Sequence, residues 1–317
     1  MSKKTIEDLG EFGLIDEIKK WVLPLTPTLS PRGRGKGEGI IGIGDDTAVF
    51  RSQSGMNQLL TIDALVEGVD FLRKKAAPQD IGWKALAINL SDIAAMGGIP
   101  KVAVISLSLP PRTTVDFVKG FYEGIRKLAQ KFGVSIVGGD LSRGKVFSSS
   151  IALLGESHPK FTIYRTRAKI GDFVCVTGRL GGSILGKHLN FTPRIKEGQF
   201  LAEQGVSAMI DISDGLEQDL KHITDESHVG GMIDERKIPI SKKALKLARG
   251  DRRAALQHAL SDGEDFELLF TISEDRLYSL EKAWRKKFKL PLTQIGKIVA
   301  RNNAALKVRK RLGFQHF

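Results

Sequence analysis

Blocks of apolar residues at helical spacing alternate along the chain with short apolar runs bounded by glycine and polar residues, a pattern typical of α/β proteins. In the block 80–100, apolar residues cover nearly the whole circumference of a predicted helix, as they do in buried helices. Asp80 is a suitable N-cap for this helix, and Gly97-Gly98 followed by Pro100 is a stop signal. We therefore expect one buried helix over this block.

Asp92 projects from an apolar part of this predicted helix surface. Without a partner, burial of an ionised carboxylate costs roughly several kcal/mol, so the group becomes neutral or finds a cation. Two interpretations of Asp92 are open at this point. It is either a helix-end acid bonded to a neighbouring loop or one ligand of a metal ion.

The periodicity predicts further elements on both sides of a polar, basic connector at 157–169. A chain of 317 residues is long enough for two α/β domains, which we place at 1–156 and 157–317. Strands are predicted at 58–65, 102–109, 134–137, 147–155, 172–177, 208–212, 266–272, 293–299 and 304–308, and helices at 10–22, 115–132, 216–227 and 273–289.

A stretch rich in proline, serine, glycine and basic residues interrupts the first domain at 24–39. It lacks the glycine-lysine spacing of a phosphate-binding P-loop and the helix pattern that follows one. Its composition predicts an inserted flexible loop.

Composition excludes several classes of protein. Hydrophobic residues make up 41% of the chain and charged residues 27%, and no apolar run approaches the roughly 20 residues of a membrane span. The single cysteine, Cys175, excludes an internal disulfide framework, suits a reducing cytosol, and lies in an apolar run that predicts a core position. We expect a cytoplasmic protein with no membrane partner.

The net charge of +13 raises the question of a nucleic-acid partner. The basic residues are dispersed apart from clusters at 285–289 and 301–311, and aromatic residues, 7% of the chain, do not alternate with those clusters as a stacking surface requires. We interpret the clusters as solvated basic faces and expect no nucleic-acid partner. A nucleic-acid-binding protein is kept as an alternative of a different class.

Acidic residues of one kind recur at the ends of predicted elements. Each lies next to glycine or inside an apolar run, whereas a solvated surface scatters its acids among lysines and polar residues. Asp140, for example, follows Gly138 and Gly139 at the predicted carboxyl end of a strand, where α/β proteins place ligands. The set is Asp45, Asp46, Asp63, Asp92, Asp140, Asp211 and Asp214.

So many carboxylates favour Mg²⁺, which takes hard oxygen ligands and shares them with substrate phosphates. Zinc is disfavoured because the chain has no cysteine set and no histidine pair at metal spacing, His222 and His228 being six residues apart. No Ser-His-Asp arrangement or activated cysteine supports covalent catalysis. The residues alone predict a magnesium-dependent, phosphate-handling α/β enzyme that catalyses mostly by positioning and electrostatics, and they identify no substrate.

Seven segments, in order, resemble the thiamine-monophosphate kinase family: GEFGLID, IGDDTAV, TIDALVEGVDF, WKALAINLSDIAAMGG, VGGD, DISDGL and DGEDFEL. The resemblance implies an α/β (α+β) fold of the two-domain aminoimidazole ribonucleotide synthetase-like type. In that fold the N-terminal sheet forms the barrel of a homodimer and the C-terminal domain is α/β. The resemblance also implies direct in-line transfer of the ATP γ-phosphoryl group to thiamine monophosphate. Several Mg²⁺ ions would assist this final step of thiamine diphosphate biosynthesis.

The resemblance further implies site residues, by their positions in these motifs. The implied metal ligands are Asp46, Thr61, Ile62 through its carbonyl, Asp63, Asp92, Asp140, Asp211 and Asp214. The implied ATP contacts are Asp46, Tyr122, Gly139, Asp140, Arg165 and Ser213, and the implied contacts to the thiamine part are Asp70, Glu264 and Phe314. Arg165 would pair with phosphate, the two acids would face the cationic ring system, and Phe314 would stack on it.

The chain departs from the family pattern at four positions. Asp70 stands where the family commonly has His, and Ile62 where it has Thr or Ser. Asp262 replaces a glycine, and Phe314 replaces a tyrosine. These departures concern the thiamine site more than the metal site. A second enzyme hypothesis is a related ATP-dependent enzyme of the same superfamily, one that closes a ring or activates an amide.

Overall fold

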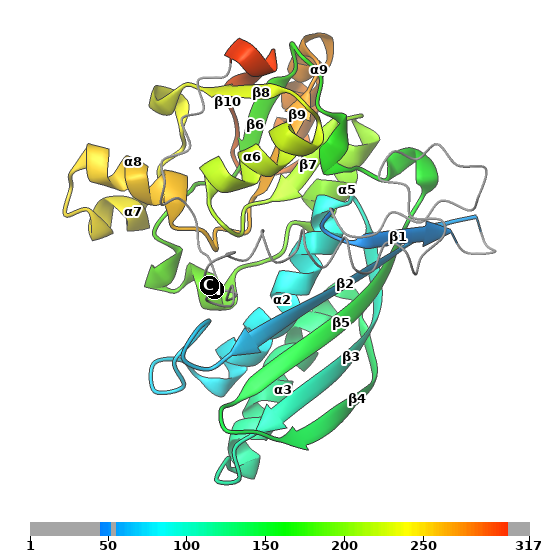
Figure 1. Ribbon diagram of the computed structural model, residues 1–317, viewed down its shortest axis with the longest axis vertical. Helices are drawn as coiled ribbons and strands as arrows, with labels where there is room; N and C mark the ends of the chain where they lie inside the picture. The colour runs from blue at the N-terminus through cyan, green and yellow to red at the C-terminus, as the bar shows by residue number, and fades with distance from the viewer. Residues whose placement is uncertain (1–44, 52–54, 304–317) are drawn as a thin grey trace, which may run out of the picture.

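Two five-stranded sheets organise the protein, which a computed structural model describes over residues 45–51 and 55–303 (Figure 1). The first sheet has the strand order β1 (Ala48–Arg51), β2 (Asn57–Val66), β5 (Ser148–Ser157), β3 (Ile99–Leu109) and β4 (Ser135–Arg143). The second has the order β7 (Ala208–Asp211), β9 (Leu268–Ile272), β6 (Phe173–Thr177), β10 (Leu292–Val299) and β8 (Gly230–Ile233). The predicted elements at 10–22 and 304–308, the insert at 24–39 and Phe314 lie outside the described residues.

Helices cover one face of the first sheet and surround the second. The helices are α2 (Pro78–Ala95), α3 (Val115–Phe132), α4 (Lys187–Asn190), α5 (Ile195–Glu203), α6 (Leu216–Glu226), α7 (Lys242–Leu247), α8 (Arg252–Ser261) and α9 (Glu274–Lys287). In Figure 1, α2 and α3 lie behind the first sheet, and α2 runs up toward the second. The α/β architecture predicted from the sequence is confirmed, whereas the domain boundary between 156 and 157 stays a prediction.

Alternation along the strands gives the first sheet two different faces. In β2, Leu59 and Leu65 are buried against the helices, whereas Leu60 is 41% and Ile62 68% exposed. Side chains of successive strand residues point to opposite faces. We call the face that is turned away from α2 and α3 the outer face.

The buried helix predicted at 80–100 is α2, but its start differs from the prediction. It begins at Pro78 with Ala77 at the N-cap, and Asp80 lies in the first turn. Proline suits this first position because its missing N–H has no partner to lose there. The helix ends at Ala95, just before Gly97 in the left-handed conformation, and Pro100 belongs to β3.

Strand β4 is longer than the sequence predicted. Gly138, Gly139 and Asp140 lie inside it, not after its carboxyl end. Glycine is required within this strand because a Cβ on Gly139 would lie 2.1 Å from the carbonyl oxygen of Ile105 on β3. Close approach to a neighbouring strand, rather than a turn, therefore explains this glycine.

Cys175 on β6 is fully buried, and burial raises the pKa of its thiol, so the predicted core position is confirmed. Among the described residues, no helix has both the length and the apolar character that crossing a bilayer would take.

Glycines bring the backbone of α2 into direct contact with its neighbours. A Cβ on Gly82 of α2 would lie 1.9 Å from the carbonyl oxygen of Phe121, and a Cβ on Gly124 of α3 would lie 1.9 Å from that of Gln79. On the other side, a Cβ on Gly198 of α5 would lie 2.1 Å from the carbonyl oxygen of Ala94. Helix α2 is thus fixed between one helix of each half of the chain.

We expect Gly124→Ala to lower the free energy of unfolding by about 1–3 kcal/mol, because the added methyl group forces two packed helices apart. Urea denaturation followed by circular dichroism measures the change. Lys127→Ala, on the exposed side of the same helix, is the control and should stay within about 0.5 kcal/mol of the wild type. Equal stability of the Gly124 variant and the wild type would show that the contact relaxes without cost.

Candidate functional site

Three acids from distant parts of the chain meet where α2, β7 and the turn before β1 come together. Asp46 lies in that turn, Asp92 in the last turn of α2, and Asp211 at the end of β7. Each offers a carboxylate oxygen, and these oxygens all lie within 4.8 Å of one another. We call these residues the acid cluster.

Strand β2 and α2 add hydroxyl groups to the acid cluster. The Thr61 hydroxyl donates a short hydrogen bond to Oδ2 of Asp92, and the Ser91 hydroxyl donates one of 2.5 Å to Oδ2 of Asp211. Asp63, on the same face of β2 as Thr61, lies close enough for its charge to act on Asp92. The structure therefore brings together five of the predicted metal ligands: Asp46, Thr61, Asp63, Asp92 and Asp211.

The acids of the cluster raise one another's pKa values. Burial raises the pKa of Asp92 well above its usual value, and the nearby charges of Asp63 and Asp211 raise it further. Burial also raises the pKa of Asp211 to about 8, again with help from neighbouring acids. In the absence of a cation, the cluster retains protons near neutral pH.

Arg165 lies against the acid cluster. Its Nη2 atom is 2.6 Å from Oδ1 of Asp46, and its Nε atom is 3.5 Å from Oδ1 of Asp45. Burial raises the pKa of Asp45 to about 7 although Arg165 opposes the shift. Asp45, one of the seven acids noted in the sequence but not among the metal ligands that the resemblance implies, therefore shares the guanidinium group with Asp46.

The donor set of the acid cluster fits Mg²⁺. All nearby side-chain donors of the cluster are oxygens, from carboxylates and hydroxyl groups, and Mg²⁺ prefers such ligands. Oδ2 of Asp46 is buried and has no hydrogen-bond partner among the described residues, as expected of an atom that a metal ion would satisfy. Asp46, Asp92 and Asp211 would hold such an ion.

We expect the melting temperature of the metal-free protein to fall as the pH rises from about 5 to about 8. The pKa values of Asp45 and Asp211 are higher in the folded protein, at about 7 and about 8, than the ordinary 3.8. The folded state therefore binds more protons than the unfolded chain in this range, so the free energy of unfolding decreases with pH.

Calorimetry in EDTA and in Mg²⁺ tests this dependence. The stabilisation by Mg²⁺ should grow between about pH 6 and about pH 8, because the metal competes with protons for the same oxygens. A melting temperature that rises with pH in EDTA, or an effect of Mg²⁺ that does not change with pH, would contradict the titration assigned to these acids.

A second acidic group adjoins the start of α6. Asp214, Asp219 and His222 offer ligand atoms within 4.8 Å of one another. Oδ2 of Asp219 accepts hydrogen bonds from the backbone N–H groups of Asp214, at 3.2 Å, and Gly215, at 3.1 Å. Asp219 thereby fixes the turn that presents Asp214 and Ser213. Asp219 does not stand out in the sequence, because an acid in a first helical turn is commonplace, and His222 was considered there only as a zinc ligand paired with His228.

Three predicted residues lie away from the acid cluster. The registers align Ala64 of β2, Ser150 of β5, Ser106 of β3 and Asp140 of β4 in one row on the outer face. Asp140 is therefore three strands from β2 and on the opposite face from Asp63. Gly139 lies on the same edge strand, and Tyr122 of α3 is 36% exposed. The Ile62 side chain also points to the outer face, which leaves only its carbonyl for a ligand role.

Two residues assigned to the thiamine part line one cavity of about 830 Å³. Asp70 lies on the loop after β2, and Glu264 on the loop before β9. His258 and Asp262 also line it, with Nδ1 of His258 2.9 Å from Oδ2 of Asp262. This volume suits a small organic ligand. We call this space the acceptor cavity.

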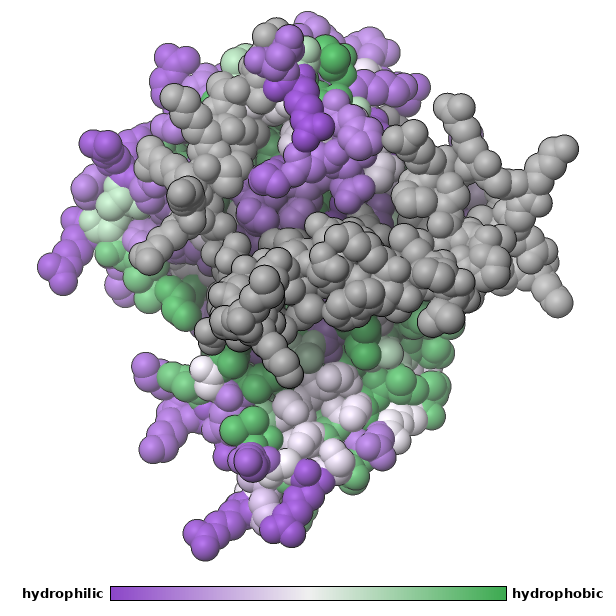
Figure 2. All heavy atoms as spheres, viewed as in Figure 1, coloured by the Kyte–Doolittle hydropathy of each residue, from purple (hydrophilic) through white to green (hydrophobic). Residues whose placement is uncertain are grey.

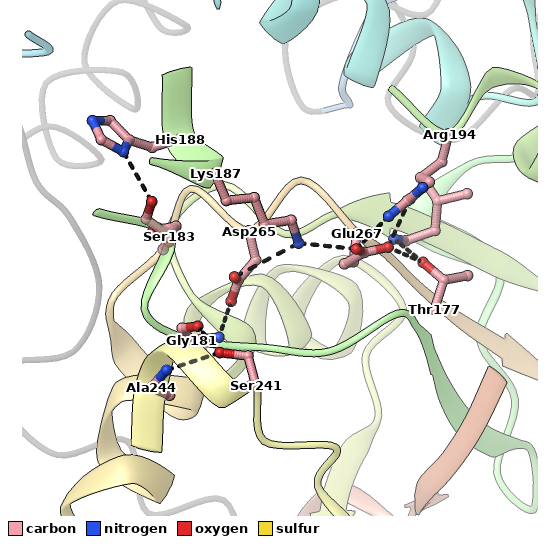
Figure 3. A network of polar contacts seen from close by, with 12 residues as sticks. Thr177, Gly181, Ser183, Lys187, His188, Arg194, Ser241, Ala244, Asp265 and Glu267 are labelled. Atoms are coloured by element: carbon pink, nitrogen blue, oxygen red, sulfur yellow. Dashed lines mark hydrogen bonds and ion pairs between the residues drawn. The ribbon is translucent and has the colours of Figure 1, made fainter. Parts of the chain in front are cut away.

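A buried polar network supports the loop that carries Glu264 (Figure 3). Arg194 donates to both oxygens of Glu267, at 2.8 and 2.6 Å, and Lys187 lies 2.9 Å from one of them. Asp265 accepts a 2.6 Å hydrogen bond from the N–H group of Gly181. Burial works against the charge of Glu267, but Lys187 and Arg194 hold its pKa below the usual value. In the sequence, only the acids of the segment DGEDFEL pointed to this network; their partners Lys187 and Arg194 could not be predicted.

Comparison with known proteins gives consistent matches. The family model described as AIR synthase related protein, N-terminal domain, matches residues 44–156, and that of the C-terminal domain matches residues 147–309. A thiamine-monophosphate kinase of Rhodopirellula baltica is 41% identical over 82% of this chain and 84% of its own length. One of Buchnera aphidicola is 37% identical over 88% of this chain and 93% of its own.

Among solved structures, AaThiL complexed with AMPPCP and TMP has a TM-score of 0.85 and 32% identity, and the match covers 100% of both chains. The two-domain aminoimidazole ribonucleotide synthetase-like fold predicted from the sequence is confirmed by these matches.

Proposed function

This chain belongs to the thiamine-monophosphate kinase family, and on that premise we propose that it transfers the γ-phosphoryl group of ATP directly to thiamine monophosphate with the help of Mg²⁺. The products are thiamine diphosphate and ADP. The solved relative that binds AMPPCP, an ATP analogue, together with TMP supports this pair of substrates. The presence of a single cysteine, which excludes an internal disulfide, supports a cytoplasmic location.

The observation that carries the proposal is the direct contact between the acceptor cavity and the turn that follows β7. The backbone N–H of Glu264 donates a 2.7 Å hydrogen bond to the carbonyl oxygen of Ser213. Ser213 follows Asp211 of the acid cluster by two residues. A ligand in the cavity therefore lies beside the place where the cluster would hold metal and polyphosphate, as in-line transfer between two substrates requires.

The residues present suffice for this chemistry without a general base. The attacking phosphate oxygen of the acceptor is already anionic, so the main barrier is repulsion between two polyanions. Magnesium held by the acid cluster would neutralise polyphosphate oxygens. Arg165 supplies a fixed positive charge beside the same site, and Asp70 and Glu264 present acids to a cationic ring system in the cavity.

We also propose that the protein acts as a homodimer through the outer face of the first sheet. Leu60, Ile62 and Val104 are 41%, 68% and 43% exposed there. Ala152 pairs with both Ile62 and Val104, so these apolar side chains form a continuous surface. In Figure 2, green and near-white residues gather over this sheet, whereas purple residues dominate the other half of the molecule. Apolar patches of this kind mark protein interfaces.

Dimerisation through this face would explain the position of Asp140. Within one chain, Asp140 lies three strands from β2 and points away from the acid cluster. If it binds the same metals or nucleotide, it does so in the site of a second copy. We propose that each active site combines the acid cluster and acceptor cavity of one chain with Asp140 and Gly139, on β4, of the other.

A phosphate-transfer assay tests the proposed function. The purified protein is incubated with ATP, Mg²⁺ and thiamine monophosphate, with thiamine as the control acceptor, and thiamine diphosphate is detected directly. Product should form only with the monophosphate and the metal. A folded, ATP-binding protein that makes no product would exclude this acceptor and favour a ring-closing or amide-activating relative.

A further inference from the structure

Lys84, in the second turn of α2, is buried in the wall between the two halves of the chain. Its side chain is 1% exposed. Its Nζ atom donates a 3.1 Å hydrogen bond to the carbonyl oxygen of Asp70 and forms a short ion pair with Oε1 of Glu264. A lysine buried to this extent is rare unless its charge is paired.

The two partners of Lys84 are the two described residues that the sequence assigned to the acceptor. Asp70 and Glu264 come from segments far apart in the chain and line the same acceptor cavity. The Asp70 carboxylate is itself fixed, because its Oδ2 atom accepts a 2.7 Å hydrogen bond from the N–H group of Val66. One lysine thus joins the loop of Asp70 to the loop of Glu264.

The loop of Glu264 requires such support. Glu264 has a φ angle of 53° and Phe266 one of 47°, which are conformations that non-glycine residues rarely adopt. Strained backbone of this kind persists where surrounding contacts determine it. The described contacts include the Glu264–Ser213 hydrogen bond and the stacking of Phe266 on Phe191, with ring centroids 4.0 Å apart.

We propose that Lys84 is a positioning residue for the acceptor. It fixes the Glu264 carboxylate through Oε1, so that Oε2 is left to face the cationic heteroaromatic part of a phosphate ester in the cavity. The hydrogen bond from Lys84 to the carbonyl oxygen of Asp70 fixes the position of the ammonium group that holds Glu264. This inference rests on the proposed function, since it assumes that the cavity binds thiamine monophosphate.

Steady-state kinetics of Lys84→Met, Glu264→Gln and the double variant test the proposal. Lys84→Met should raise the KM for thiamine monophosphate by about 10–100-fold, the range typical for residues that orient a ligand-binding group. The KM for ATP should change by less than about twofold, since the acid cluster does not contact Lys84. The double variant should be no worse than Glu264→Gln alone, because Lys84 acts through that carboxylate.

Controls separate positioning from general stability. Lys74→Met makes the same chemical change at an exposed lysine near the cavity and should leave both KM values unchanged. Lys84→Gln retains a hydrogen-bond donor and is used if Lys84→Met does not fold; it should give an intermediate KM.

The outcomes are distinguishable. No turnover by the wild-type protein overturns the proposed function and this inference with it. Wild-type turnover together with an unchanged KM for thiamine monophosphate in a folded Lys84 variant overturns this inference alone. Effects of Lys84→Met and Glu264→Gln that multiply in the double variant also overturn it, because they would show independent roles.

Discussion

Asp92→Asn is expected to lower kcat by roughly 10²–10³-fold while leaving the fold intact, which is the loss typical when one preorganised charged group is removed from an active site. A carboxylate oxygen of Asp92 lies within 4.8 Å of one from Asp46 and one from Asp211, so the three could bind the same ion. Asp92 also accepts the hydrogen bond from the Thr61 hydroxyl. An amide keeps the size of the side chain, but it removes the negative charge and places a donor group where a metal ligand is required. Initial rates at saturating substrates, over a range of Mg²⁺ concentrations, measure the effect.

The same substitution should stabilise the metal-free protein, and this distinguishes it from a folding defect. Burial and the charges of Asp63 and Asp211 disfavour an ionised Asp92, so the folded metal-free protein keeps this group protonated at a free-energy cost that a permanently neutral side chain avoids. Melting in EDTA should therefore occur at a higher temperature than for the wild type. Asp116→Asn, at an exposed acid on α3, is the control. Wild-type turnover by a folded Asp92 variant would remove Asp92 from the metal site.

The long helices could be predicted from the sequence because their apolar positions repeat over several turns. The bounds of α3 agree with its prediction, and α2 differs from its prediction mainly at the N-terminus. Strands β1 and β8, with four residues each, are too short for alternation to be visible, although β7, which is equally short, was predicted. Strand β4 continues through two glycines, which in sequence are typical of a turn, because its close approach to β3 is decided by tertiary structure.

Some residues of the candidate site could likewise be predicted from the sequence, and others could not. Acids next to glycine or within apolar runs stand out, and five predicted ligands do meet in space. Lys84 and Arg194 do not stand out in the sequence, because basic residues usually face solvent. Their partners, Glu264 and Glu267, are 180 and 73 residues away along the chain. Local pattern carries no information about such pairs.

Asp140 presents the clearest difference between sequence order and spatial arrangement. Its motif suggests that it works with Asp63 and Asp92, yet in the structure it lies on the outer face, at the far edge of the same sheet. Asp140→Ala is expected to raise the Mg²⁺ concentration needed for half-maximal activity by about tenfold or more, since loss of a group that merely supports a metal ligand already costs about 10–100-fold in metal affinity. An unchanged Mg²⁺ dependence would remove Asp140 from the metal site.

Mixed dimers of Asp92→Asn and Asp140→Ala decide whether Asp140 acts in the site of its partner. If it does, a mixed dimer contains one intact site, formed by the acid cluster of the Asp140→Ala chain and the Asp140 of the Asp92→Asn chain. Half of the dimers in an equimolar mixture are mixed, so about a quarter of the wild-type activity should return at limiting Mg²⁺, where each variant alone is nearly inactive.

The matched control is a mixture of Asp92→Asn and Asp211→Asn. Both of these changes affect the acid cluster of their own chain, so no mixed dimer has an intact site and no activity should return. Recovery in the first mixture but not in the second would place Asp140 across the dimer interface. If mixed dimers form and neither mixture recovers, Asp140 does not complete the partner's site. A position at the far edge of the sheet would then have to be explained by a structural role in the outer face.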